Sequence, residues 1–224
     1  MFRLGKLEFK VKEGGASLWG GFYDGAMSER MQLLPVPQMN WYIDIDLERG
    51  DFIYELTPED LEDLEEGEEY IYESVAPRLY HNNGFELDIT SWKDIEGITL
   101  NWDSECNEKG EEAGYLYVFE HEDVTKGKIE FLKRNGTQFF VRWSGTANVY
   151  WNEEYGADVP FLFEGEVNFD GISAHCDKIK TMDELVPVLQ QFVNLDEYKC
   201  VSQDSYKIQK GTSYSWRFIP QNIH

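Results

Sequence analysis

The chain has 224 residues, with 43 acidic and 20 basic side chains and a formal net charge of −23. Its hydrophobic content of 42% and aromatic content of 15% suit a packed core and exclude a disordered chain. No apolar run reaches the length of a membrane helix or of a signal-peptide core, so we expect no membrane partner.

Period-two alternation of apolar and polar residues predicts most of the regular structure as strands. Leu7, Phe9 and Val11 alternate with charged residues at the start of the chain. Further strands are predicted at 41–47, 85–90, 98–102, 115–120, 127–133, 137–143, 161–169 and 206–218. Asn135-Gly136 lies between two of them and is typical of a hairpin turn.

Helix signals are fewer. Thr57-Pro58 is a helix start, and the spacing of Ile71, Val75 and Leu79 predicts a further helical stretch after it. A short turn is expected at 91–94.

The clearest helix start is near residue 181. Thr181 can cap the first turn while Glu184 reaches back to it, and an apolar stripe follows as far as residue 193. Pro187 predicts a kink or a late start. Together these patterns predict an α+β fold, predominantly antiparallel β-sheets with a few short helices.

Three short pieces of sequence recur in the same order. Residues 5–9 resemble 127–131, residues 18–21 resemble 142–145, and residues 57–61 resemble 181–185, at offsets of 122 to 124. Order and spacing together favour two tandem related α+β halves, 1–113 and 114–224, although one continuous domain fits the same chain. Residues 1–112 carry a net charge of −18 and residues 113–224 carry −5.

The cysteines Cys106, Cys176 and Cys200 are an odd number without C-x-x-C spacing. This pattern argues against a disulfide framework and against a structural zinc site. We therefore expect a cytoplasmic protein.

Two strands carry paired carboxylates, at Asp44 and Asp46 and at Glu164 and Glu166. Such oxygens are ligands for hard cations, but a half-exposed strand shows the same alternation without any metal. We expect no metal and no cofactor.

Two places join a histidine to acidic or thiol neighbours, at 121–123 and 175–177. Catalytic partners are rarely sequence neighbours, so neither assigns a catalytic residue. Residues 151–155, which combine Trp151 with Glu153 and Glu154, are the first choice for a glycosidase-like site, against the alternative of a hairpin loop.

The net charge opposes nucleic-acid binding, because affinity for phosphate comes from lysine and arginine. The local basic group is expected to be balanced surface, and its members are Lys126, Lys128, Lys133, Arg134 and Arg142.

The acidity itself is concentrated, since residues 40–123 hold 26 acidic and four basic side chains. A solvated surface explains such acidity in many proteins, and electrostatic recognition of a basic partner is the functional alternative. We expect a non-enzymatic acidic binding protein, of which an immunity-type inhibitor of a basic bacterial toxin or nuclease is one form. The predicted partner contacts are Asp60, Glu62, Asp63, Glu65, Glu66, Glu68, Glu69, Tyr70 and Tyr72.

Two alternatives remain open. One is a carboxylate-based hydrolase, glycosidase-like or dependent on a divalent metal. The other is an oligomeric structural module that associates through exposed strand edges.

Overall fold

The structure is a computed structural model of the chain. It describes residues 1–30, 34–51, 74–75, 78–81, 84–103, 114–117, 121–149, 156–208 and 211–221. Strands make up most of the described residues, with a few short helices, as the alternation predicts. None of the described helices has the length and apolar character needed to cross a membrane.

The first part of the chain contains β1 (Phe2–Leu4), β2 (Leu7–Phe9), β3 (Val11–Tyr23), α1 (Gly25–Arg30), β4 (Gln38–Leu47), β5 (Gly50–Asp51), β6 (Ser74–Val75), β7 (Arg78–Tyr80), the 3₁₀ helix η1 (Trp92–Ile95) and β8 (Thr99–Trp102). The second part contains β9 (Tyr115–Tyr117), β10 (His121–Asn135), β11 (Gln138–Val149), β12 (Gly156–Cys176), α3 (Met182–Leu189), the 3₁₀ helix η2 (Leu195–Glu197), β13 (Tyr198–Ile208) and β14 (Gly211–Pro220).

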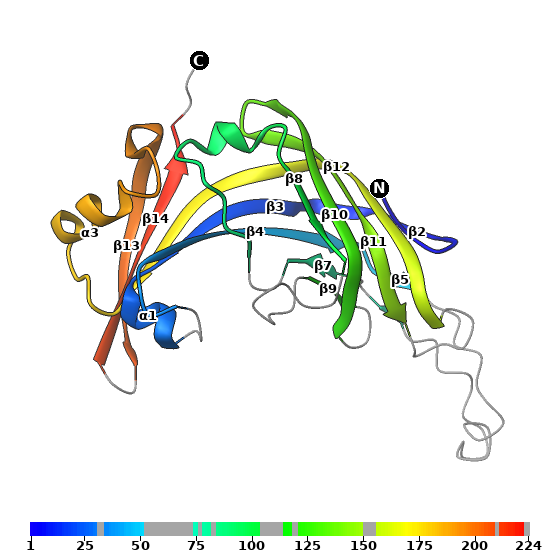
Figure 1. The fold of residues 1–224 in the computed structure, drawn as a ribbon, viewed down its shortest axis with the longest axis horizontal. Coiled ribbons are helices and arrows are strands. Elements are labelled where there is room, and N and C mark those ends of the chain that lie inside the picture. Colours follow the sequence, from blue (N-terminus) through cyan, green and yellow to red (C-terminus); the bar gives the residue numbers. More distant parts are fainter. Residues whose placement is uncertain are drawn as a thin grey trace, which may run out of the picture.

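The main sheet closes on itself. Hydrogen-bonded neighbours run from β11 through β10, β9, β7, β4 and β3 to β12, and β12 pairs again with β11. Only the β3–β12 pairing is parallel among the described strand pairs of this sheet, so the antiparallel prediction is confirmed in the main. Figure 1 shows β3, β4 and β12 bent into an arch, with β13 and β14 at one end and β8, β10 and β11 at the other.

One hydrophobic core joins the strands of this sheet. Trp41, Trp143 and Trp216 are each no more than 1% exposed, although they come from distant parts of the chain. Phe131 and Phe139 meet edge to face across the β10–β11 hairpin, with ring centroids 6.1 Å apart. The predicted segments 1–113 and 114–224 thus share one sheet and one core. Their origin by duplication stays a prediction.

Two local predictions are confirmed. The β10–β11 hairpin closes at Asn135 opposite Gln138, and Gly136 takes the positive φ of +61° that this tight turn requires. At the start of α3, Thr181 Oγ1 accepts from the Glu184 backbone N–H at 3.3 Å, and Glu184 Oε2 accepts from the Thr181 backbone N–H at 3.2 Å.

The end of this helix differs from the prediction. Residues 182–189 are helical and include Pro187, but the apolar stripe continues beyond them to Val193. Phe192 and Val193 follow the helix in turns. A proline supplies no backbone N–H, which favours a short helix.

Two other predictions are wrong. The helical spacing of Val75 and Leu79 does not produce a helix, because β6 and β7 occupy these positions. Leu79 is buried as the middle residue of a short strand, opposite Ile45 on one side and Leu116 on the other. The predicted strand at 85–90 is reduced to one bridge between Phe85 and Trp41. The predicted helix start at Thr57 lies outside the described residues.

Candidate functional site

The predicted partner contacts, from Asp60 to Tyr72, lie outside the described residues, as does the glycosidase-like choice at 151–155. The structure does describe the residues on either side of the acidic segment 52–73 that contains these contacts. Gly50 and Asp51 of β5 pair with Val75 and Ser74 of β6, so the residues that precede and follow this segment are neighbours.

Charge is divided unevenly between the described residues and the rest of the chain. The described ranges hold 26 acidic and 18 basic residues, a net charge of −8. The remaining residues hold 17 acidic and two basic ones, a net charge of −15. Segment 52–73 alone holds ten acidic residues and no basic one.

The paired carboxylates of β4 bind an arginine. Arg78 Nε lies 2.9 Å from Asp44 Oδ1 and 3.1 Å from Asp46 Oδ1, and the Arg78 Nη2 atom also bonds Asp44. The hydrogen bond to Asp44 raises the pKa of the Arg78 guanidinium above its ordinary value. Both carboxylates are therefore ion-paired with one arginine, which offsets one of their two negative charges. No cluster of three or more possible metal ligands occurs among the described residues.

The local basic group also has acidic partners. Arg142 Nε lies 2.7 Å from Glu164 Oε1, Lys128 Nζ lies 2.7 Å from Glu130 Oε1, and Lys126 Nζ lies 3.1 Å from Asp158 Oδ1. These ion pairs fit the prediction of a balanced surface.

The motif at 175–177 is part of a packed aromatic row. The Tyr23 ring stacks on His175 with centroids 5.9 Å apart, and the Tyr42 hydroxyl donates to Tyr23 Oη at 3.3 Å. Trp19 stacks on Tyr42 at 5.3 Å. Burial raises the pKa of the Cys176 thiol and lowers that of His175, so this thiol stays protonated at neutral pH and is a poor nucleophile.

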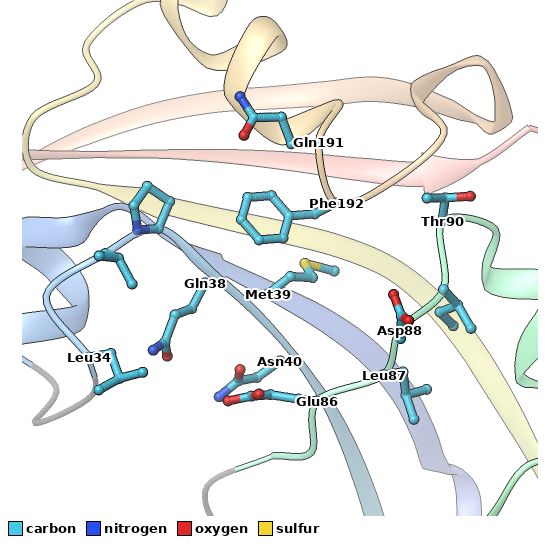
Figure 2. A pocket seen from close by; sticks show the side chains of 13 residues that line it. Leu34, Gln38, Met39, Asn40, Glu86, Leu87, Asp88, Thr90, Gln191 and Phe192 are labelled. Carbon is cyan, nitrogen blue, oxygen red and sulfur yellow. The ribbon is translucent and has the colours of Figure 1, made fainter.

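A groove lies at the beginning of β4, where three segments distant in sequence come together. Its volume is about 300 Å³, and residues of 34–40, 86–90 and 191–192 line it. Figure 2 shows Phe192 and Met39 near the middle, Leu34 on one side, and Glu86 beside Asn40. No local sequence pattern connects the three segments, so the sequence alone does not predict this groove.

The wall formed by 86–90 is anchored at both ends. Phe85 exchanges two backbone hydrogen bonds of 2.8 Å with Trp41, and the Thr90 carbonyl accepts from Asn194 N–H at 2.8 Å. Next to Thr90, the Ser91 hydroxyl bonds the buried Glu197 carboxylate at 2.9 Å. A wall held in this way keeps the groove open without a cost of ordering on binding.

The groove combines apolar and acidic groups. Leu34 and Val36 are 55% and 51% exposed at its rim, which is high for large apolar side chains. Glu86 and Asp88 contribute carboxylates, and no lysine or arginine is among the described residues that line it. The arrangement favours a ligand that carries both apolar and positively charged groups.

Two other hollows have mixed charges. One of about 910 Å³ lies between α1 and the β13–β14 hairpin, and its Arg30 and Asp177 face each other at 3.7 Å. The second, of about 260 Å³, holds Asp170 and Arg217 beside Trp19. Their opposite charges offset one another, so neither has the single-sign character of the groove.

Comparison of the chain with protein-family models, with curated protein sequences and with solved structures finds no match. Neither family nor function follows from similarity.

Proposed function

We propose that this chain is a non-enzymatic acidic binding protein that recognises a basic protein partner. An immunity-type inhibitor, which would cover the cationic cleft of a bacterial toxin or nuclease, is one form of such a protein. The observation that carries the proposal is the concentration of negative charge in segment 52–73. Its ten acidic residues have no basic neighbour within the segment, and the residues that flank it, in β5 and β6, pair with each other.

The charges elsewhere support this choice. Arg78 offsets one of the two negative charges of Asp44 and Asp46, and Arg142 offsets that of Glu164, so these ion pairs reduce the net field of the carboxylates. A concentrated negative field accelerates encounter with a cationic partner and discriminates against anionic ones. Within the segment, Asp60, Glu62, Asp63, Glu65, Glu66, Glu68 and Glu69 are the proposed charged contacts, with Tyr70 and Tyr72 as aromatic anchors.

The test is affinity capture from the native cell extract with the tagged full chain, at low and at high salt. We expect proteins of high isoelectric point that are released as salt rises, since exposed ion pairs are screened. A variant with the seven acidic contacts changed to amides should lose these proteins.

The matched control changes seven exposed acidic residues elsewhere, and it should retain the captured proteins. These residues are Glu8, Glu13, Asp94, Glu166, Asp183, Asp196 and Asp204. Capture of acidic partners alone, or equal losses in both variants, would rule the proposal out.

A further inference from the structure

The edge of β4 that borders the groove has an open position in its hydrogen-bonding pattern. Trp41 uses its N–H and C=O to bond Phe85, so these groups point away from β3. Backbone groups two residues apart on a strand point to the same side, so those of Met39 also face away from β3. No described residue bonds Met39 on this side.

The groove lies along this edge and not over one face of the sheet. Met39 points to the core face, where its Cε occupies the space that a Cβ on Gly20 would need. Gln38 and Asn40 alternate with it and line the same groove from the other face. An extended chain beside Met39 would therefore reach both sets of side chains.

The opposite wall does not occupy this position. After the bridge at Phe85, residues 86–90 form no strand ladder with β4, and the hollow lies between the two. Leu34 and Val36 at the rim and Phe192 above Met39 supply apolar contacts (Figure 2), while Asp88 supplies a negative charge.

We infer that the groove binds an extended segment of the basic partner by strand addition to β4. The segment bonds the N–H and C=O of Met39, places an apolar side chain against Phe192 and the rim, and directs a lysine or arginine toward Asp88. Backbone bonds supply affinity in this binding mode, and alternate side chains supply specificity. The inference rests on the proposed function for the nature of the partner.

The first experiment is selection of a random heptapeptide library against the full chain. We expect enrichment of peptides in which lysine or arginine alternates with apolar residues. The groove variants are Asp88→Lys and, separately, the double change Leu34→Ser with Val36→Ser. Each should lower the affinity for the selected peptides about tenfold or more, or by about 1.4 kcal/mol. The substituted side chains are all exposed, so these variants should fold normally.

The control variants are Asp204→Lys and Val201→Ser, which change an exposed acidic and an exposed apolar residue on β13. They should bind the selected peptides as the unchanged chain does. Enrichment of acidic peptides, failure to enrich any peptide, or equal binding by the groove variants would overturn the inference.

A second measurement separates strand addition from docking by side chains alone. Each amide of a selected peptide is N-methylated in turn, which removes one backbone donor. Strand addition predicts that N-methylation weakens peptide binding only at alternate amides, since only every second amide faces β4. If N-methylation weakens binding equally at all positions, or at no position, strand addition is contradicted.

The two proposals can fail separately. If the captured basic partner is bound equally by the groove variants but lost from the variant of segment 52–73, the groove inference is wrong and the proposed function stands. If no basic partner is captured while basic heptapeptides still bind at the groove, the proposed function is wrong and the chemistry of the groove stands.

Discussion

The imidazole of His81 lies edge-on to the indole of Trp102, with the ring centroids 5.4 Å apart and the planes at 85°. The ring centroid of Phe85 lies 5.3 Å from that of the same imidazole, and the buried His81 Nδ1 has no hydrogen-bond partner among the described residues. Burial lowers the pKa of His81 to about 4. The histidine is therefore neutral in the folded protein near neutral pH and must gain a charge in an apolar surrounding when acid is added.

This burial predicts a loss of stability in mild acid. Between pH 6.5 and 4 the unfolded chain binds a proton at His81 and the folded chain does not, so the free energy of unfolding falls as pH falls. The total effect is about 3 kcal/mol. His81→Leu should remove this part of the pH dependence. Urea unfolding of both proteins across this range measures it as a difference, in which shared carboxylate effects cancel. If the free energy of unfolding depends on pH in the same way for both proteins, His81 does not contribute to the pH dependence.

The Arg78 ion pair predicts a second change in stability. Asp44 has a side chain only 13% exposed, so removal of its partner leaves a poorly hydrated charge. Arg78→Met should lower the free energy of unfolding by about 1–2 kcal/mol, since the half-exposed guanidinium is partly screened by solvent. Adding Asp44→Asn should recover part of this loss.

The control for this pair is Arg142→Met, which breaks a more exposed ion pair with Glu164. We expect Arg142→Met to lower the free energy of unfolding by clearly less than Arg78→Met does. Similar losses from Arg78→Met and Arg142→Met, measured by urea unfolding, would contradict the role of burial.

A third prediction concerns Asp24, which joins α1 to the end of β12. Its Oδ2 accepts backbone N–H groups of Asp177, Lys178 and Ile179 at 2.9, 2.6 and 3.1 Å, and its Oδ1 accepts from Met27 at 2.9 Å. Asp24→Ala leaves these donors without their acceptor and should cost about 3 kcal/mol.

Thr181→Ala provides the comparison, because it removes a single capping hydrogen bond from α3 and should cost about 1 kcal/mol. Asp24→Asn keeps one acceptor oxygen, so its loss in the free energy of unfolding should lie between those of Asp24→Ala and Thr181→Ala. Thermal or urea unfolding ranks the three variants. An Asp24→Ala protein as stable as Thr181→Ala would show that the multiple contacts are not additive.

The fourth prediction separates binding from metal-dependent hydrolysis. Ca²⁺, Mg²⁺ and Mn²⁺ should leave the melting temperature unchanged, because Arg78 already ion-pairs with both Asp44 and Asp46 and would repel a cation there. Specific binding of a metal to the folded state would raise the midpoint by mass action. A rise that saturates with metal concentration would favour the hydrolase alternative, and an EDTA-treated sample serves as the reference.

The conformation could be predicted from the sequence where one short segment contained all of the relevant interactions. The alternation of Trp41, Ile43 and Ile45 predicts β4, and Thr181 with Glu184 predicts the start of α3. The conformation could not be predicted where packing against segments distant in sequence decided it. Leu79 has helical spacing with Val75, but contacts with Ile45 and Leu116 place it in a strand.

The sequence by itself determined the concentration of negative charge, the Asn135-Gly136 hairpin and the capping box of α3, because each depends on residues close together in the chain. Only the tertiary structure decided which carboxylates are neutralised and where a groove forms. Asp44 meets Arg78 between the neighbouring strands β4 and β7, and Met39, Asp88 and Phe192 come together where segments 86–90 and 191–192 lie against the start of β4. Such contacts depend on long-range strand pairing, which no local pattern of residues specifies.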